Sequence, residues 1–451
     1  MIKHDISVLK EWLRERRISE VECLVPDMAG IARGKILPTN KFLSGIEHGT
    51  LRLPESIFGQ MVTGADAETK EVTYQAPDMV VVPDPSTIRV VPWYAEPTAQ
   101  VICDCANREG KQIAVAPREV LRRVMKIYET KGWRPVVAPE LEFFLAQKNI
   151  DPDYPLLPHA GKSGRPQTGR QAYGIDAVNE FDPLFEDIYD YCEAEEIGID
   201  SLIHEEGVAQ VEINFNHDDP MTLADQAFLF KRTVRQAALR HDLYATFMAK
   251  PYEQEPGSAM HIHQNIVDAK GRNLFANREG KDTRLFLNHI AGLQKYLPDV
   301  MPMIAPFVNS YRRLVRYLSA PVNTHWGHEN RTVGLRIPES DQKTRRVENR
   351  VPGADSNPYL AIAASLACGY LGMIEGLSPT KAMEGNAYES MRFPLPRHLL
   401  DAIVRFRAAD DLKSVLGEPF VDLYCDVKAS EHDAYQQVIS PWERQHLLLN
   451  V

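Results

Sequence analysis

The sequence has few cysteines and none of the short motifs of the common nucleotide-binding and zinc-hydrolase folds. Its 6 cysteines are scattered, and Cys103 and Cys105 form an isolated pair, so no disulfide or metal framework is expected. There is no Walker A motif, no glycine-rich G-x-G-x-x-G stretch and no H-E-x-x-H stretch. These absences argue against a P-loop enzyme, a protein kinase fold and a zinc hydrolase.

Positive charge and long apolar segments are also scarce. The formal net charge is −11 and no basic stripe stands out, which argues against a nucleic-acid partner. The longest apolar run, residues 360–374, is too short and too rich in Gly and Ala to span a membrane, and it predicts a buried helix. Residues 1–20 predict an amphipathic helix rather than a signal peptide. We therefore expect a cytoplasmic protein that binds neither membranes nor nucleic acids.

The length of 451 residues exceeds a typical single core, so at least two domains are expected. Residues 76–98 carry prolines between β-branched runs, which predicts short strands and turns. Pro117 then opens a clear helix over residues 118–131. We place the boundary between residues 106 and 116, which gives domains 1–113 and 114–451.

Two carboxylates, Glu140 and Glu142, lie in the stretch A-P-E-L-E-F-F among apolar neighbours. The neighbours suit a strand, which points residues i and i+2 to one face, so the two acids would share a face and repel each other. Buried carboxylates stay ionised only when they are paired, and a cation is the obvious partner. All-oxygen coordination favours Mg²⁺, Mn²⁺ or Ca²⁺ over zinc. From these two residues alone, an exposed strand edge with two solvated acids remains the alternative.

Four further stretches alternate polar and apolar residues as strands do. Their polar residues are Gln210, Glu212 and Asn214 in 208–216, His261 and His263 in 259–266, Arg336 in 333–337, and Arg346, Glu348 and Arg350 in 345–350. Each stretch alone is compatible with a half-solvated sheet. Together, and with Glu205 just before the first stretch, they predict one charged cleft for two or more divalent cations, with arginines that suit phosphate and carboxylate. Hard metal ions with arginines are a common arrangement for phosphoryl transfer from ATP.

The same stretches resemble a known family. In order along the chain, the resemblance to the glutamine synthetase family is carried by P-E-L-E-F-F, H-E-E-G-V-A-Q-V-E, P-G-S-A-M-H-I-H, N-R-T-V-G-L-R-I-P and R-R-V-E-N-R-V-P-G-A-D-S-N-P-Y-L. It implies an α+β fold with a small N-terminal β-grasp domain and a larger catalytic domain, in which helices flank a curved antiparallel sheet. It also implies a homo-oligomer, a dodecamer of two hexameric rings, with active sites between neighbouring subunits.

The resemblance further implies an ordered reaction. ATP phosphorylates the γ-carboxylate of glutamate, and a nitrogen nucleophile then attacks the γ-glutamyl phosphate. The cofactor would be Mg²⁺ or Mn²⁺, two or more per site. By resemblance, the ligands of one metal are Glu142, Glu205 and Glu212, and those of the other are Glu140, His261 and Glu348.

By resemblance, residues of this sequence also match the positions at which the family binds phosphate, glutamate and ATP. Arg331 and Arg336 match the catalytic arginines that lie over the transferred phosphate. The glutamate-binding positions match Gly257, Arg313, Arg331 and Arg350. The ATP-binding positions match His263, Asn265, Arg336, Lys343 and Arg346, and Asp200 matches an ATP-side acid only loosely.

The acids that hold ammonium in glutamine synthetases are missing. Where the family has an Asp in D-G-S-S-I, this chain has Leu53 in L-P-E-S-I, and where a loop carries a Glu, it has Ser319. A compact cation needs nearby negative charge, whereas Leu and Ser supply none and leave room for an alkyl group. We expect Leu53, Glu55 and Ser319 to line an amine pocket. The chain thus resembles γ-glutamylpolyamine synthetases, and we interpret it as a ligase that joins glutamate to a primary amine, either a polyamine or an alkylamine.

Two other interpretations stay open at this point. If Glu55 shifts into the place of the missing Asp, the chain is an ordinary glutamine synthetase that uses ammonia. A non-catalytic structural or regulatory relative is the third alternative, which the complete ligand set disfavours. Pro256 stands where the family often has an Asn against glutamate, so a glutamate analogue is conceivable. The base that deprotonates the amine is not identified, and its candidates are Glu55, His325 and Glu329.

Overall fold

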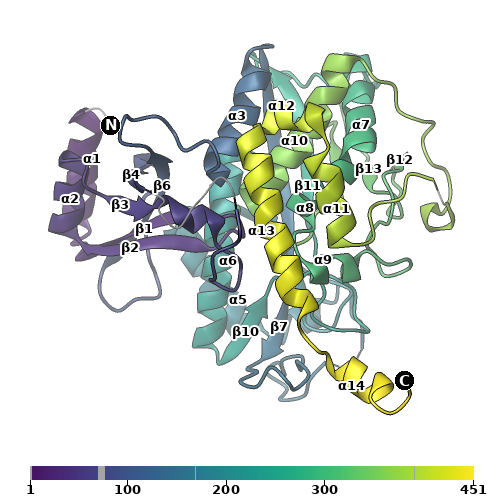
Figure 1. Ribbon diagram of the computed structural model, residues 1–451, viewed down its shortest axis with the longest axis horizontal. Coiled ribbons are helices and arrows are strands. Elements are labelled where there is room, and N and C mark those ends of the chain that lie inside the picture. Colours follow the sequence, from purple (N-terminus) through teal and green to yellow (C-terminus); the bar gives the residue numbers. More distant parts are fainter. Residues whose placement is uncertain (1–2, 70–76, 168, 391) are drawn as a thin grey trace.

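The structure is a computed structural model that describes residues 3–69, 77–167, 169–390 and 392–451. It has a smaller N-terminal part and a larger part with most of the helices, and each part contains one sheet (Figure 1). The expectations for residues 1–20 and 76–98 and for the N-terminal domain include residues 1–2 and 70–76, which lie outside the described residues.

The N-terminal part is built on a mixed sheet. Its elements are α1 (Lys3–Glu15), β1 (Glu20–Pro26), β2 (Ala32–Pro38), α2 (Thr39–Glu47), β3 (Arg52–Pro54), β4 (Asp78–Pro83), β5 (Arg89–Val90) and β6 (Thr98–Ala106). The strand order is β2-β1-β6-β4-β3, and β5 also pairs with β6. β1 and β6 are parallel, while β1 and β2 form an antiparallel pair against which α2 packs.

The larger sheet has 8 strands in the order β12-β13-β14-β11-β7-β9-β8, and β10 also pairs with β7. These strands are β7 (Trp133–Gln147), β8 (Ile199–His204), β9 (Gln210–Phe215), β10 (Leu243–Thr246), β11 (Met260–Asp268), β12 (Trp326–His328), β13 (Leu335–Ile337) and β14 (Val347–Asn349). β12 and β13 are parallel, and the other pairs are antiparallel. The expected α+β fold is confirmed, with this one parallel pair as an addition.

Two of the predicted strands are shorter than the polar alternation suggested. β13 covers only the end of residues 333–337, and β14 covers only the middle of residues 345–350. A proline follows each strand closely, Pro338 after β13 and Pro352 after β14. Proline has no backbone N–H to donate, so β13 does not continue through Pro338, whereas backbone bonds continue beyond β14, from the N–H of Arg350 to Gly334 and from the N–H of Met260 to the carbonyl oxygen of Pro352. Arg346 and Arg350 therefore flank β14 instead of lying within it.

Helices surround the larger sheet. They are α3 (Pro117–Glu129), α4 (Ile175–Asn179), α5 (Asp182–Ala194), α6 (Pro220–Arg240), α7 (Arg284–Tyr296), α8 (Met301–Ile304), α9 (Val308–Arg313), α10 (Pro358–Glu375), α11 (Leu399–Arg407), α12 (Asp410–Leu416), α13 (Glu418–Gln436) and α14 (Pro441–Leu447). In Figure 1, α13 runs along the front of the larger part, and α14 projects from its lower end.

Helix α10 contains the longest apolar run and lies in the core. Asn357 caps its start by accepting bonds from the backbone N–H groups of Tyr359 and Leu360, and Gly376 ends it with a φ of 65°. The helix packs against α3, α6 and α7. It is long and apolar enough to cross a membrane, but 83% of the segment is buried inside the protein. The prediction of a buried helix is therefore confirmed.

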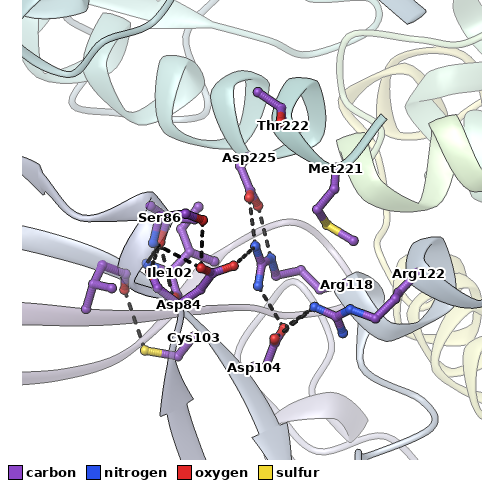
Figure 2. Close-up of polar contacts among 12 residues, drawn as sticks. Asp84, Ser86, Ile102, Cys103, Asp104, Arg118, Arg122, Met221, Thr222 and Asp225 are labelled. Carbon is purple, nitrogen blue, oxygen red and sulfur yellow. Dashed lines mark hydrogen bonds and ion pairs between the residues drawn. The ribbon is translucent and has the colours of Figure 1, made fainter. Parts of the chain in front are cut away.

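A buried arginine joins the two parts of the chain (Figure 2). Arg118 of α3 donates to Asp225 of α6 at 3.0 and 2.7 Å. The same guanidinium donates to Asp104 of β6 at 2.8 Å and to Asp84, just after β4, at 3.0 Å. Arg122, one turn further along α3, also donates to Asp104, at 3.0 and 2.8 Å. These bonds fix the N-terminal sheet against two helices of the larger part.

Candidate active site

The polar stretches form neighbouring strands, and their register places charged residues opposite one another. On β7, Glu140 lies opposite Asn214 of β9 and, on the other side, opposite His261 of β11. Glu142 lies opposite Glu212 of β9. Directly opposite residues of antiparallel strands have their side chains on the same face. These acids and the imidazole therefore meet on one face of the sheet.

The next two strands extend this row. His263 of β11 lies opposite Glu348 of β14, and Glu348 lies opposite Arg336 of β13. Because His261 and His263 are two residues apart on one strand, both imidazoles face the same side. The structure thus brings the predicted acids, imidazoles and arginine together, although the strands are separated by long segments of chain.

Two groups of side chains lie close enough to hold a metal ion, with ligand atoms within 4.8 Å of one another in each group. They are Glu140, His261 and Glu348 in the first group, and Glu142, Glu212 and His261 in the second. The first group equals the set predicted for one metal. The second contains Glu142 and Glu212 of the other predicted set together with His261, and Glu205, the third residue of that set, lines the same cavity. His261 lies between the groups, with Nδ1 3.3 Å from Oε2 of Glu140 and Nε2 3.9 Å from Oε1 of Glu142.

Burial and mutual repulsion act on the same carboxylates. Burial and the nearby Glu205 raise the pKa of Glu142 to about 8. Burial and the neighbouring acids raise the pKa of Glu212 well above its usual range. For Glu348, burial also acts to raise the pKa, but the charge of Arg350 outweighs it and the pKa falls to about 2. Ionising several buried carboxylates side by side costs free energy, which a bound divalent cation would offset. A ligand set made mainly of carboxylates suits Mg²⁺ or Mn²⁺.

Metal binding is expected to release protons near neutral pH. With a pKa of about 8, the carboxyl of Glu142 in the metal-free protein binds a proton at pH 7, whereas a bound cation requires the carboxylate. The affinity for Mn²⁺ should therefore rise as the pH increases from about 6 to 8. Calorimetric titration of metal-free protein in buffers of different ionisation enthalpy counts the released protons. A pH-independent affinity without proton release would contradict this expectation.

Two cavities meet at this row of side chains. The larger cavity has a volume of about 620 Å³ and contains both metal-binding groups, and the smaller one has a volume of about 390 Å³. Glu140 and Asn214 line both cavities. The buried Oδ1 of Asn214 has no hydrogen-bond partner among the described residues, so it can accept a bond from a ligand or a metal-bound water.

The smaller cavity gathers most of the residues predicted to bind ATP. They are His263, Asn265, Lys343 and Arg346, together with Asp200. Arg336 lines the larger cavity instead. The ring of His263 is held from both sides, since Nε2 lies 2.6 Å from Oε1 of Glu140 and Nδ1 accepts a bond from Arg346 at 3.0 Å. The buried Oδ1 of Asn265 has no partner within the described part of the chain and can accept a bond from a ligand.

The larger cavity gathers the residues predicted to bind glutamate and the phosphate. They are Gly257, Arg313, Arg331, Arg336 and Arg350. Arg336 and Arg350 hold Glu348 between them, with Nη1 of each arginine 2.7 and 2.5 Å from a carboxylate oxygen. The buried Nε of both arginines has no partner among the residues that the structure describes. The two guanidinium groups thus keep donors for an anionic ligand.

Arg313 is tied to the backbone, and Gly257 leaves room for it. The two terminal nitrogens of Arg313 donate to the carbonyl oxygens of Val351 at 2.7 Å and Arg350 at 3.0 Å. A Cβ atom at Gly257 would lie 2.5 Å from Cγ of Arg313 and 2.4 Å from the carbonyl oxygen of Ala249. Only glycine allows the backbone to approach this closely, which fits the predicted turn at the substrate.

Residues 114–447 match the family model described as glutamine synthetase, catalytic domain. The chain belongs to the glutamine synthetase family. It is an enzyme, a ligase of that family, which couples ATP to the ligation of glutamate. The family assignment covers the strands that carry the metal-binding groups and both cavities.

Relatives within the glutamine synthetase family match almost the whole chain. Gamma-glutamylputrescine synthetase of Escherichia coli (strain K12) is 36% identical over 436 residues, which cover 95% of this chain and 92% of the relative. Glutamate–isopropylamine ligase of a Pseudomonas species is 30% identical over 455 residues, 98% of this chain and 97% of the relative. A solved structure of GmaS in complex with ADP aligns with a TM-score of 0.84 at 26% identity and covers 98% of this chain and 99% of that chain.

The three residues predicted to line the amine pocket lie in different places. Ser319 lines the larger cavity. Leu53 is buried in β3, and Glu55 begins a short 3₁₀ helix (Glu55–Gly59) in the N-terminal part, so neither lines the cavities of this chain. Their predicted role requires the active site of a neighbouring subunit, and it stays a prediction. The two other candidate bases also lie outside both cavities: His325 bonds to Ser390 at 2.8 Å, and Glu329 accepts bonds from Arg336.

Several residues of the larger cavity have no role predicted from the sequence. They are Tyr173, Glu206, Gln210, Tyr317 and Tyr388. Gln210 belongs to the polar alternation in residues 208–216, and its buried amide donates to Glu142 at 3.2 Å and to the carbonyl oxygen of Gly257 at 3.1 Å. The tyrosines lie in loops and in a 3₁₀ helix (Ala387–Glu389), where no periodic pattern marks them.

Proposed function

We propose that the protein joins the γ-carboxylate of glutamate to a primary amine, a polyamine or an alkylamine, through a γ-glutamyl phosphate, with release of ADP and phosphate. One observation carries the proposal. A cavity of about 390 Å³ meets, at Glu140, a cavity lined by carboxylates and arginines, and this second cavity is also lined by Ser319, which by resemblance stands where the family has an ammonium-binding acid. The names of the two curated relatives, a putrescine and an isopropylamine ligase, support the choice of an amine.

The side chains divide the reaction between them. Gly257, Arg313 and Arg350 hold glutamate, while Arg331 and Arg336 neutralise the phosphoryl group as it leaves ATP for the γ-carboxylate. The nucleotide is held by His263, Asn265, Lys343 and Arg346, with Arg336 at the phosphate end. Bound Mg²⁺ or Mn²⁺ would add positive charge at Glu140, Glu142, Glu205, Glu212, His261 and Glu348. The amine nitrogen then bonds to the γ-carbon and gives up a proton to the solvent, while the bond between the γ-carbon and the phosphate oxygen breaks and phosphate leaves.

Turnover with a primary amine is expected to exceed turnover with ammonia. Ser319 itself carries no charge, and the neighbouring carboxylate of Glu206 already pairs with Arg170, whereas an alkyl chain buries apolar surface. The value of kcat/KM should be about tenfold higher for the best amine, the gain from burying roughly two methylene groups. Release of ADP and phosphate is measured in parallel with ammonia, putrescine, spermidine, ethanolamine and short monoamines. Reactions without glutamate or without divalent metal serve as blanks.

The same assay separates the alternatives. Higher kcat/KM with ammonia than with every amine would make the protein an ordinary glutamine synthetase, with Glu55 in the place of the missing Asp. No ATP binding in calorimetry would favour a non-catalytic relative. The complete metal-binding groups speak against that class, since loss of ligands is expected once catalysis is lost.

We further propose a cytoplasmic homo-dodecamer of two hexameric rings, built from domains 1–113 and 114–451. Leu53 and Glu55 lie outside the cavities of their own chain, as a site shared between subunits would require. The segment around α14 exposes apolar side chains, including Trp442 (62%) and Leu448 (72%), that another subunit can cover. All six cysteines are free and buried, which fits a reducing compartment. Light scattering of the purified protein gives the native mass.

A further inference from the structure

The mouth of the larger cavity carries a carboxylate that the proposed reaction does not use. Glu206 follows Glu205 in the connection between β8 and β9, and its side chain lines the cavity and is 40% exposed. One of its oxygens accepts a hydrogen bond from the hydroxyl group of Ser319. A negative charge therefore lies beside the position where the ammonium-binding acid of glutamine synthetases is missing.

The charge of Glu206 is only partly compensated. Arg170 lies 3.3 Å from its Oε1, but the same guanidinium lies 3.6 Å from Oε2 of Glu255 and donates to the carbonyl oxygen of Gln254 at 2.8 Å. Two carboxylates thus share the guanidinium of Arg170, and Lys250 adds a second positive charge next to Glu255, where its Nζ donates to the backbone carbonyl oxygen. A carboxylate has about four acceptor sites, so Glu206 can bind a further cation beside Arg170 and Ser319.

Tyrosine rings form the wall next to this carboxylate. Tyr317 and Tyr388 line the cavity with their ring centroids 5.2 Å apart. Tyr173, Tyr317 and Ser319 have φ values of 61°, 64° and 62°, in the left-handed region that residues other than glycine seldom adopt. Such conformations persist where the surroundings hold them and cluster at ligand sites. The rings offer apolar area to a methylene chain and π-faces to an alkylammonium group.

We propose that Glu206 binds the second ammonium group of an α,ω-diamine, whose methylene chain lies along Tyr317 and Tyr388. This inference rests on the proposed function, because the other amino group of the diamine is the nucleophile inside the cavity. A half-exposed carboxylate at the mouth is placed for the distal end of the substrate. A monoamine can follow the same path, but it leaves Glu206 without this partner.

Glu206→Gln tests the proposal because it removes the charge and keeps the size of the side chain and an acceptor for Ser319. The ratio of kcat/KM for 1,4-diaminobutane to that for n-butylamine is expected to fall about tenfold, as for the loss of one charge-assisted hydrogen bond. The fall should arise from the KM of the diamine. Glu206→Asp, which keeps the charge on a shorter side chain, should retain more of the preference.

Glu253→Gln is the matched control. It removes a carboxylate from the nearby segment before Gly257, but Glu253 is exposed and lines neither cavity, so the ratio should stay that of the unchanged enzyme. An unchanged ratio in Glu206→Gln, or equal losses with both amines, would overturn the proposal. Failure of the proposed function looks different, because the unchanged enzyme would then prefer ammonia to both amines.

Discussion

Replacing Glu348 with alanine is expected to abolish measurable turnover. Glu348 is fully buried, belongs to the first metal-binding group, and pairs with Arg336 and Arg350. In the proposed reaction its loss removes a metal ligand beside the transferred phosphoryl group, and it leaves the guanidinium groups of Arg336 and Arg350 without their counter-charge. Removing one preorganised electrostatic group commonly costs about 10²–10³ in kcat, and the lost ligand adds to this. Release of ADP and phosphate at saturating Mg²⁺, glutamate and amine measures the effect.

The control must separate chemistry from folding. Glu348→Gln keeps the shape and one acceptor and should also be inactive, while it disturbs the fold less than alanine. Asp282→Asn removes another carboxylate that pairs with an arginine, Arg345, outside the metal-binding groups, and should leave turnover near normal. Near-normal activity in a folded Glu348→Ala protein would show that the metal-binding residues are misassigned.

Replacing Arg118 with methionine is expected to destabilise the protein by about 3–5 kcal/mol, the usual cost of leaving a buried ion pair without one partner. The side chain of Arg118 is 3% exposed and forms ion pairs with Asp84, Asp104 and Asp225. Methionine fills the space but leaves these carboxylates facing one another. Chemical denaturation at one fixed protein concentration measures the loss, because dissociation of an oligomer would otherwise add to it.

The pH dependence of this loss has a defined sign. Without Arg118, burial raises the pKa of Asp225 further above its unfolded value, so the folded variant takes up a proton as the pH falls. The variant should therefore regain part of its stability on acidification. Arg122→Met is the control, since Arg122 pairs with Asp104 but is 37% exposed, and should cost less than about 1 kcal/mol. Equal denaturation midpoints for Arg118→Met and the unchanged protein would contradict the argument.

The sequence predicts which side chains of one strand share a face better than it predicts which strands pair with one another. Alternating polar residues identify which side chains of β9 and β11 share a face, because that periodicity is local. Which residues lie opposite one another depends on strands far apart in the chain, as Glu140 and His261 do. The strand register also brings His261 beside Glu142 and Glu212, while the ligand role that the resemblance gives to Glu205, which lines the same cavity, stays a prediction.

The rim of the site is the part that the sequence does not reveal. Tyr173 and Tyr317 come from irregular segments and have positive φ values, so neither helical nor strand periodicity applies to them. Glu206 follows a predicted metal ligand, but its contact with Ser319 joins residues more than a hundred positions apart. The predicted role of Leu53 and Glu55 depends on another subunit, which no pattern within one chain can place.

Strand β7 is hydrogen-bonded along both edges, to β9 on one side and to β10 and β11 on the other, and it carries the carboxylate that both cavities share. The carboxylate at the proposed site of phosphoryl transfer thus stands on a strand that is held along both edges, whereas Glu206, Tyr317 and Ser319 lie in connections between elements, a kind of segment that generally varies more than strands do. In the proposed reaction, substitutions in these connections can consequently alter the choice of amine without disturbing the strand that carries Glu140.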